Sequence, residues 1–338
     1  MNALETLIAA LSEVCAGLPD RRKTPRRPGE YTMSDIGPPA FSLFFMGCAS
    51  FLDHQRRPAE GNGRSNCQTL FGIQKILTDP HIRSMLDGVP TAAFDPLFYK
   101  AIETGGVLDP FERLDGWILI ALDGTEHFCP RCSSRKRYDG GIEYFHSLLG
   151  ASIVAPGHQQ VPPLPPEFIA PRDGAKKQGC ERNAAKRWLA RHGAAVKSHR
   201  PVFLGDDLFA CQPIAAAIQQ ASGNFIPICK PSSHWTTTEY LHGATLEEHQ
   251  TTSVTPGKGR SATIYRWFSG VPLRDTDDAL AVNWFSIEIQ NAKGKRTYCN
   301  SFVTDLTVAA DIAARGRALE ERERNVQRPE KQQIQPGA

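Results

Sequence analysis

Two aspartates directly follow short apolar runs, a position from which side chains can do chemistry. Asp123 follows Trp117–Leu122, and Asp206 follows Val202–Leu204 and one glycine. Short continuous apolar runs are typical of strands buried on both faces, and catalytic groups gather at strand ends in α/β sheets. Carboxylates at adjacent strand ends can hold two Mg²⁺ ions about 4 Å apart, one activating a water or a 3′-hydroxyl and one stabilising the leaving oxygen. The pair therefore predicts metal-assisted chemistry.

Each aspartate also has a structural interpretation. Asp-Gly at Asp123 and Asp-Asp at Asp206 are common turn and helix-cap sequences, and taken singly each favours that interpretation. Taken as a pair, they favour the functional interpretation, because Asp123 ends the most hydrophobic predicted strand and Asp206 precedes a predicted helix.

A strongly basic helix is predicted between the two aspartates. Residues 172–200 carry nine Lys or Arg against two acidic residues. Residues four apart share a helix face, and Arg182 with Lys186 and Arg187 with Arg191 have this spacing. A solvated helix face explains the charge as well as DNA contact does, but beside a metal site that cuts DNA we predict phosphate contact. The predicted DNA-binding residues are Lys176, Lys177, Arg182, Lys186, Arg187 and Arg191.

The cysteines indicate a reduced protein and do not predict a zinc site. Nine cysteines are scattered along the chain. Cys129 and Cys132 have the spacing of half a zinc knuckle, but a closed site needs two more ligands, and no other Cys or His stands at a diagnostic spacing. Reduced, partly buried thiols are therefore the preferred interpretation.

Composition narrows the class of protein. The formal net charge is only +3, so an argument for nucleic-acid binding rests on local charge. The best apolar segment, residues 40–52, is interrupted by polar residues and is shorter than the roughly 20 residues that a membrane-spanning helix needs. The N-terminus has no basic run before its apolar stretch, unlike a signal peptide. We expect a cytoplasmic protein with no membrane partner.

The pattern of apolar residues changes along the chain. Helical spacing gives way to alternating strands and helices, and then to β-rich runs separated by turn residues. This order predicts an α/β protein with a mixed sheet, a helical N-terminal domain and a β-rich insertion.

The predicted parts are 1–100, a helical region that can bind DNA ends; 101–234, the core; 235–303, the β-rich insertion; 304–318, a return to the core; and 319–338, a charged, glutamine-rich tail. In the core we predict strands at 117–122, 144–154, 202–204 and 224–229, helices at 176–192 and 211–222, and a proline-rich loop or edge segment at 161–171.

Six short motifs, taken in order, resemble a family of bacterial insertion-sequence transposases with a ribonuclease-H-like DDE domain. The resemblance covers about residues 40–318, and an ordered set of motifs is more specific than any one of them. The motifs are Leu122-Asp123-Gly124-Thr125-Glu126; Pro165-Pro166-Glu167-Phe168-Ile169; Lys177-Gln178-Gly179-Cys180-Glu181 with Asn183 to Leu189; Leu204-Gly205-Asp206-Asp207-Leu208; Cys229-Lys230-Pro231-Ser232-Ser233-His234; and Val303-Thr304-Asp305-Leu306.

The resemblance implies a ribonuclease-H-like core with an aspartate on its first strand, an aspartate after its fourth strand and a glutamate on a later helix. By position Asp123 is the first acid, and Asp206 is our choice for the second because it comes directly off the strand; Asp207 is the alternate. The resemblance also implies two Mg²⁺ ions, a β-rich insertion before the glutamate, DNA as the partner at both element ends and target, and a homodimer on DNA.

The sequence departs from the family pattern at two places. Gly179 stands where the family usually has an aspartate. After Gly316-Arg317 the family continues into a helix of the form Arg-Trp-Lys-Ile-Glu-Asn-Glu, which carries the third acid, and this chain has no such segment. Permissible codons for the tail, read one nucleotide later, give Trp-Lys-x-Glu-Asn-Glu, which resembles the missing helix. We therefore predict that this copy is frameshifted and has lost the third acid.

The expected activity is Mg²⁺-dependent cleavage and joining of DNA strands at insertion-sequence ends, without a covalent protein–DNA intermediate and impaired in this copy. The alternative is a catalytically inactive, DNA-binding remnant of a transposase. A third interpretation is an unrelated zinc-binding structural protein.

Overall fold

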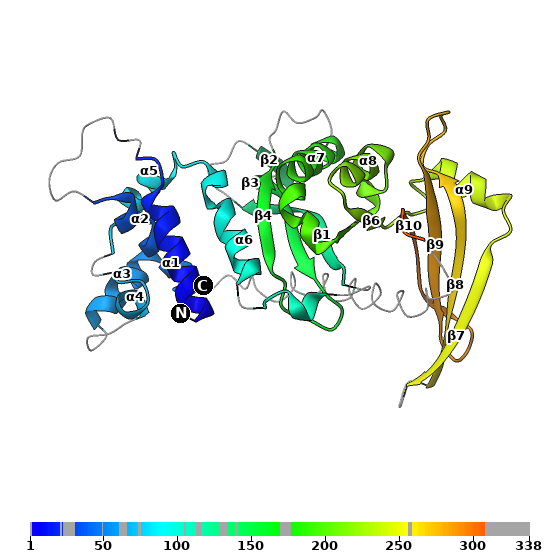
Figure 1. Cartoon of the computed structure of the whole chain (residues 1–338), viewed down its shortest axis with the longest axis horizontal. Helices are drawn as coiled ribbons and strands as arrows, with labels where there is room; N and C mark the ends of the chain where they lie inside the picture. Colours follow the sequence, from blue (N-terminus) through cyan, green and yellow to red (C-terminus); the bar gives the residue numbers. More distant parts are fainter. Residues whose placement is uncertain are drawn as a thin grey trace. The chain divides into compact units, whose positions relative to one another are not determined.

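The chain forms two compact units, residues 1–108 and 109–338, which are described separately. The structure is a computed structural model, and it describes residues 2–20, 22, 31–48, 50–60, 66–73, 76–104, 106–112, 116–128, 134–138, 141–169, 177–255 and 259–307. Figure 1 shows the elements along the chain.

The described elements of the first unit are all helical, as the spacing of its apolar residues predicts. They are α1 (Ala3–Ala16), α2 (Met33–Phe45), α3 (Phe51–Glu60), α4 (Asn66–Thr69), α5 (Asp79–Leu86), η1 (Thr91–Phe94) and α6 (Asp95–Glu103).

Helices α1 and α2 approach closely in this unit. Asn2 caps α1 by accepting a hydrogen bond from the backbone N–H of Glu5, while the Glu5 carboxylate accepts one from the backbone N–H of Asn2. A Cβ at Gly37 of α2 would lie 2.3 Å from Sγ of Cys15, so the glycine makes room for the buried thiol. Burial raises the pKa of Cys15 to about 11, which keeps the thiol protonated and unreactive.

The second unit contains a mixed sheet with strand order β2-β3-β1-β5-β6, and β4 pairs with β3. Strand β1 is antiparallel to β3 and parallel to β5, and β5 is parallel to β6. The mixed α/β character predicted from the sequence is confirmed. The elements are η2 (Asp109–Phe111), β1 (Ile118–Phe128), β2 (Ser134–Tyr138), β3 (Gly141–Val154), β4 (Pro163–Phe168), α7 (Lys177–Val196), η3 (Lys197–His199), β5 (Pro201–Gly205), η4 (Asp207–Phe209), α8 (Gln212–Gln220) and β6 (Asn224–Pro227).

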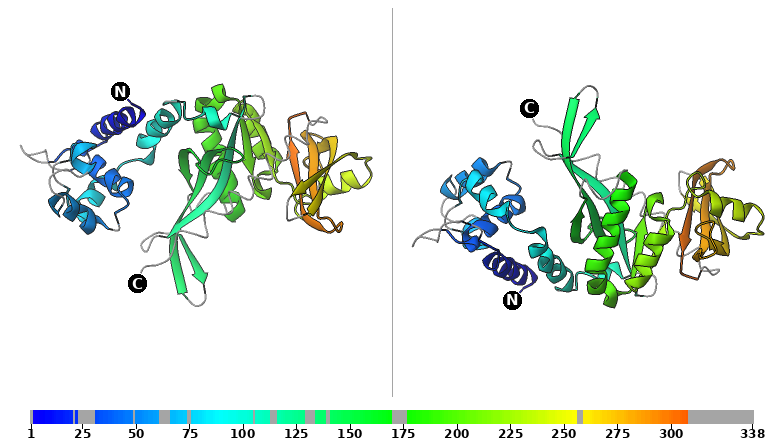
Figure 2. Two further views of the ribbon diagram at one scale, coloured as in Figure 1. Left: turned by 90° about the horizontal axis from the view of Figure 1, so that it is seen from below. Right: turned by 90° about the horizontal axis from the view of Figure 1, so that it is seen from above.

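Helices α7 and α8 cover one face of the mixed sheet (Figure 2). The ring of Trp188, a fully buried residue of α7, lies 6.0 Å from the ring of Phe203, and its indole N–H donates to the carbonyl of Pro165 at 2.6 Å. Ile214 of α8 lines a small cavity together with Phe203 and Leu122. Side chains alternate along a strand, so Leu119, Val202 and Leu204 belong to the opposite face.

A second, antiparallel sheet follows, with strand order β10-β9-β8-β7. It begins after α9 (Trp235–His242) and consists of β7 (Glu247–Thr255), β8 (Gly259–Pro272), β9 (Ala281–Gln290) and β10 (Arg296–Thr304). One apolar cluster contains residues of both sheets. Its buried members are Leu119, Val154, Val202, Leu204 and Ile226 of the mixed sheet, and Tyr265, Trp267, Phe285, Ile287 and Phe302 of the antiparallel sheet.

Strand β10 brings the chain back to the mixed sheet. Ile228 and Phe302 form an antiparallel bridge, and the N–H of Cys229 donates to the carbonyl of Ser301 at 2.7 Å. The Asp305 carboxylate accepts a hydrogen bond from the backbone N–H of Phe225 at the start of β6, and burial raises the pKa of Asp305. Asp305 therefore has a structural role at the edge of the mixed sheet.

The structure corrects several predicted element boundaries. The strand predicted at 117–122 continues to Phe128, because its antiparallel pairing with β3 outlasts its parallel pairing with β5. Asp123 therefore lies within β1 and not at its end. Strands β2 and β7 were not predicted, and α9 is a helix inside the segment predicted to be β-rich. The proline-rich segment is an edge strand, β4, which fits residues that lack an N–H.

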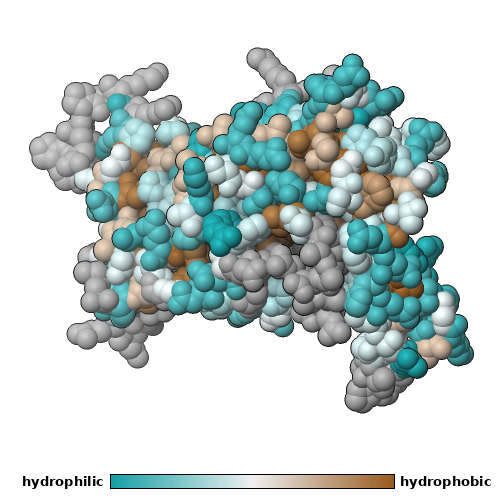
Figure 3. All heavy atoms as spheres, turned by 45° about the vertical axis from the view of Figure 1, so that its right-hand side comes forward, coloured by the Kyte–Doolittle hydropathy of each residue, from teal (hydrophilic) through white to brown (hydrophobic). Residues whose placement is uncertain are grey.

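The visible surface is mainly polar. Figure 3 shows hydrophilic residues over most of the described surface on that side, with hydrophobic residues in separate small patches. Among the described helices, none combines the length and the apolar character that crossing a membrane requires.

We predict that Gly193→Ala lowers the free energy of unfolding by about 1 kcal/mol. Gly to Ala inside a helix ordinarily stabilises by about 0.5–1 kcal/mol. Here the new Cβ would lie 2.6 Å from the Cβ of Ala221, and overpacking of this kind costs about 1–3 kcal/mol. Urea unfolding followed by tryptophan fluorescence measures the difference.

The matched control is Gly243→Ala at the end of α9. A Cβ there meets nothing within 4 Å, so we expect a change within about 0.5 kcal/mol. A Gly193→Ala variant more stable than the wild type would contradict the close contact between α7 and the end of α8 at Ala221.

Candidate functional site

The parallel ladder between β1 and β5 sets the relation between the two predicted catalytic aspartates. Its last pair is Ala121 with Leu204, so Asp123 and Asp206 each stand two residues further along their strands. Paired strands lie about 4.8 Å apart. Asp206 has extended backbone (φ −74°, ψ −174°), so alternation continues through it. Both aspartates are exposed, and alternation places both on the same side of their strands.

The two aspartates of the Asp-Asp pair are engaged differently. Oδ1 of Asp206 accepts a hydrogen bond from the N–H of Leu208 at 2.9 Å, which starts η4, and its Oδ2 has no partner among the described residues. Oδ1 of Asp207 accepts a hydrogen bond from the N–H of Lys230 at 2.6 Å and lies 3.1 Å from Nε2 of His234. Asp207 is therefore bound to the turn after β6, and Asp206 keeps an oxygen for another ligand.

A cavity of about 420 Å³ opens beside Asp206. Three carboxylates and two permanent cations line it, so it is strongly polar. The lining residues are Glu181, Arg182, Asp206, Asp207, Leu208, Lys230, Ser233 and His234.

Glu181 reaches this cavity because residue 124 is a glycine. A Cβ at Gly124 would lie 2.9 Å from Cδ of Glu181 and 3.0 Å from its Oε1. The carboxylate therefore occupies the space beside the residue that follows Asp123. From the sequence, Glu181 counted only as an acid within a basic helix. Its position could not be read from spacing, because the contact joins α7 to β1.

Two carboxylates provide suitable donors for Mg²⁺, but the described residues hold no larger preformed ligand set. Within the ranges that the structure describes, no three His, Cys, Asp or Glu side chains are grouped to hold a metal ion. The tail expected to have lost the third acid and the cysteine pair Cys129 and Cys132 lie outside those ranges.

The basic helix α7 divides its cations between two tasks. Nε of Arg187 and Nη1 of Arg191 each lie 2.8 Å from an oxygen of Glu167 on β4. Nε of Arg182 donates to the carbonyl of Leu208 at 2.9 Å, and Lys186 is exposed one turn further along the helix. The first pair thus holds β4 on α7, while Arg182 lines the cavity beside Asp206. Lys176 lies outside the described residues, and of Lys177 only the helical backbone is described.

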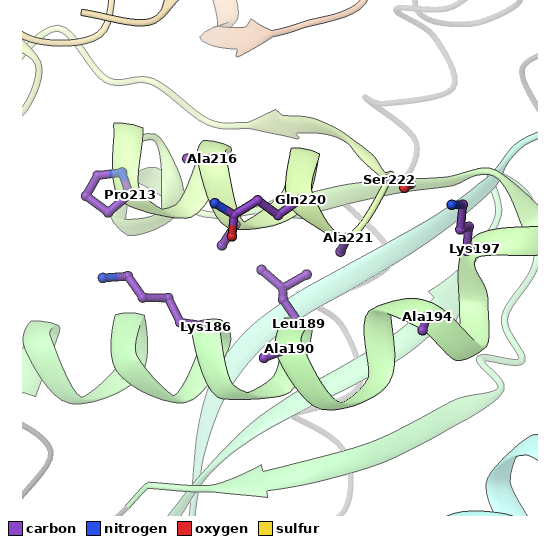
Figure 4. Close-up of a pocket in the computed structure, with 11 residues that line it drawn as sticks. Lys186, Leu189, Ala190, Ala194, Lys197, Pro213, Ala216, Gln220, Ala221 and Ser222 are labelled. Carbon is purple, nitrogen blue, oxygen red and sulfur yellow. The ribbon is translucent and has the colours of Figure 1, made fainter. Parts of the chain in front are cut away.

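Lys186 borders a groove between α7 and α8 (Figure 4). The groove has a volume of about 520 Å³, and small residues such as Ala190 and Ala217 form much of its wall. Lys186 and Lys197 lie toward opposite ends of it in the close-up. Arg182 and Lys186 therefore connect the cavity beside Asp206 to this groove along one face of α7.

Glu167 is the buried acid in the contact between β4 and α7. Its exposed fraction is 8%. Burial acts to raise the pKa of Glu167, but hydrogen bonds and charge from Arg187 and Arg191 outweigh burial and leave the pKa below its usual 4.5. The charged form is thus favoured by folding.

We predict that Glu167→Gln lowers the free energy of unfolding at neutral pH by about 1–2 kcal/mol, a value reduced from that of a buried pair because both arginines are partly exposed. A lowered folded-state pKa gives stability that is present above the unfolded pKa. The deficit should therefore be full well above pH 4.5 and shrink as the pH falls through the lowered pKa. Urea unfolding at several pH values measures it.

The matched control is Glu248→Gln, which removes an exposed carboxylate that lies 2.7 Å from Nε of Arg266. An exposed pair contributes about 0–1 kcal/mol, so we expect the smaller loss there. Equal losses for the two variants would mean that Glu167 contributes no more than a surface ion pair.

The comparisons with known proteins add no family assignment. No protein-family model matches the chain, and no curated protein matches its sequence.

Proposed function

We propose that the chain is a transposase of the DDE type, whose reaction class is Mg²⁺-dependent cleavage and joining of DNA strands. The observation that carries the proposal is the register of β1 and β5. It leaves Asp123 and Asp206 two residues beyond the same parallel pair, on neighbouring strands and on one face.

The strand order supports a ribonuclease-H-like core. Strand β2 pairs only with the first half of β3 and extends that hairpin beyond the rest of the mixed sheet (Figure 2). Without it, the order is β4-β3-β1-β5-β6, with β3 antiparallel to β1 and helices after β4 and β5. Asp123 then lies on the first strand and Asp206 follows the fourth, which are the positions that the resemblance implies.

The residues present suit Mg²⁺. Mg²⁺ prefers oxygen ligands and often uses one or two carboxylates together with substrate phosphates, and Asp206 has a carboxylate oxygen without a protein partner among the described residues. When bound, two such ions would activate the attacking water or 3′-hydroxyl and stabilise the leaving oxygen. The contribution of this chain is to place two carboxylates just beyond the parallel ladder of β1 and β5, with basic side chains beside Asp206.

The hydrogen bonds favour Asp206 over Asp207 as the second acid. The Asp207 carboxylate is bound to Lys230 and His234, so using it for a metal would break the contacts that hold the turn after β6. Asp206 can bind a metal through Oδ2 while Oδ1 keeps its bond to Leu208.

We further propose that this copy binds DNA and cleaves it poorly. The described residues supply two carboxylates just beyond the β1–β5 ladder, and the helix for the third acid belongs after Arg317 by the resemblance. The competing proposal, an inactive DNA-binding remnant, differs from this one only in cleavage. Binding and nicking must therefore be measured separately.

We predict that the 338-residue chain binds selected duplexes from the DNA that flanks its gene but nicks them poorly. Restoring the alternative reading frame after Ala318 should add the acid-bearing helix and raise Mg²⁺-dependent nicking. In the restored chain, Asp123→Asn and Asp206→Asn should each lower the nicking rate by on the order of 10²–10³, the scale on which preorganised groups stabilise a transition state. Gel assays on end-labelled duplexes tiled across the flanks measure both steps.

Asp278→Asn is the control, because Asp278 is an exposed aspartate in the loop before β9 and should leave nicking unchanged. If no flanking duplex is bound better than unrelated DNA, the transposase proposal fails. If the restored chain binds but never nicks, the chain descends from a binding protein without this chemistry. If the 338-residue chain nicks as fast as the restored chain, the prediction of impaired cleavage is wrong.

A further inference from the structure

Two cations in the cavity beside Asp206 have no acidic partner in the described part of the chain. Arg182 uses its Nε for the carbonyl of Leu208, which leaves its terminal nitrogens available. Lys230 uses its backbone N–H for Asp207 and its backbone carbonyl for the N–H groups of Ser233 and His234, and its side chain is exposed on the cavity rim. Two unpaired cations beside an open carboxylate suit a ligand that is itself anionic and binds metal.

We propose that Arg182 and Lys230 hold one phosphodiester of the DNA strand that reacts at Asp206. The inference rests on the proposed function and deepens it, since it assigns a subsite for a phosphate next to the reacting one. Arginine offers a planar fork that matches two phosphate oxygens, and lysine offers a mobile point charge. The cavity volume of about 420 Å³ falls in the range of small-ligand sites.

Asp207 acts as a positioning residue for this subsite. Its Oδ1 accepts from the N–H of Lys230 and lies 3.1 Å from Nε2 of His234, so one carboxylate fixes both ends of the turn. The hydroxyl-bearing Ser233 lies on the same rim and adds a neutral donor. The Asp-Asp pair therefore has two tasks: Asp206 would hold a metal ion through Oδ2, and Asp207 places the cation that meets the phosphate.

The subsite continues the basic face of α7. Lys186 follows Arg182 by one helical turn and borders the groove between α7 and α8. A strand leaving the cavity would pass from Arg182 toward Lys186, so successive phosphates meet successive cations. Arg187 and Arg191, which bind Glu167, take no part in this path.

The test compares Lys230→Met with Lys293→Met, an exposed lysine in the turn between β9 and β10 that loses the same charge. Binding is measured by fluorescence anisotropy on the flanking duplex that the wild type binds best, with Ca²⁺ in place of Mg²⁺ to keep the strands intact. Lys230→Met should weaken binding about tenfold and lower the salt-dependence slope by about 0.9, the contribution of one phosphate contact. Lys293→Met should change neither.

A second measurement separates contact from folding. Phosphates of the duplex are replaced one at a time by uncharged methylphosphonates. One duplex carries the methylphosphonate at the phosphate that Lys230 contacts, and wild type and Lys230→Met should bind this duplex equally. On every duplex with the substitution elsewhere, the tenfold difference in affinity should persist. A loss that persists on every duplex indicates a structural role for Lys230 and overturns the inference.

The remaining outcomes are also decisive. If the wild type binds a duplex well and Lys230→Met binds it equally well, the phosphate subsite is wrong while the proposed function stands. If the variant instead gains affinity for Mg²⁺ and leaves DNA binding unchanged, the cavity is a cation site. If the wild type binds no flanking duplex, the proposed function fails and the inference fails with it.

Discussion

The parallel pairing of β1 with β5 is the constraint on which the candidate site depends. Four residue pairs, from Ile118 with Pro201 to Ala121 with Leu204, fix how far each strand runs before its aspartate. A slip of one residue would turn each side chain of one strand to the other face and separate the carboxylates. Slippage is opposed because β5 is buried on both faces, by Trp188 and α8 on one side and by the apolar cluster shared with the antiparallel sheet on the other.

Helix α7 connects that ladder to the charged parts of the site. Its buried side holds Trp188 against Phe203 and the carbonyl of Pro165, and its arginines bind Glu167 on the edge strand β4. The same helix places Glu181 beside Gly124 and Arg182 beside Leu208. Because α7 is bound to β4 through its arginines and to β5 through Trp188, it has little freedom to rotate about its axis. The division of its cations between β4 and the cavity is therefore a fixed property of the fold.

The sequence was sufficient to predict the features that depend on the local pattern of residue types. The buried strands, helices α7 and α8 and the mixed α/β character follow from apolar periodicity. The chemistry of proline limits residues 161–171 to a loop or an edge segment, and the structure has the edge strand β4 there. It was insufficient where contacts join distant segments. The whole length of β1 depends on β3, the polar strand β7 depends on pairing with β8, and the approach of Glu181 and Lys230 to Asp206 depends on tertiary packing. From spacing alone, the six DNA-binding residues were predicted as one set. The local sequence does not show that Glu167 binds Arg187 and Arg191.

The return of the chain along β10 limits where a third acid can stand. Asp305 is anchored to Phe225, and Phe225 pairs with Phe203, three residues before Asp206 along β5. Three strand residues span about 10 Å, and a helix covers that distance in about seven residues. A chain leaving Leu306 as a helix thus reaches the level of the aspartates after about two turns. A helix that begins after Arg317, where the proposed function expects the third carboxylate, therefore has enough chain before it to reach that level.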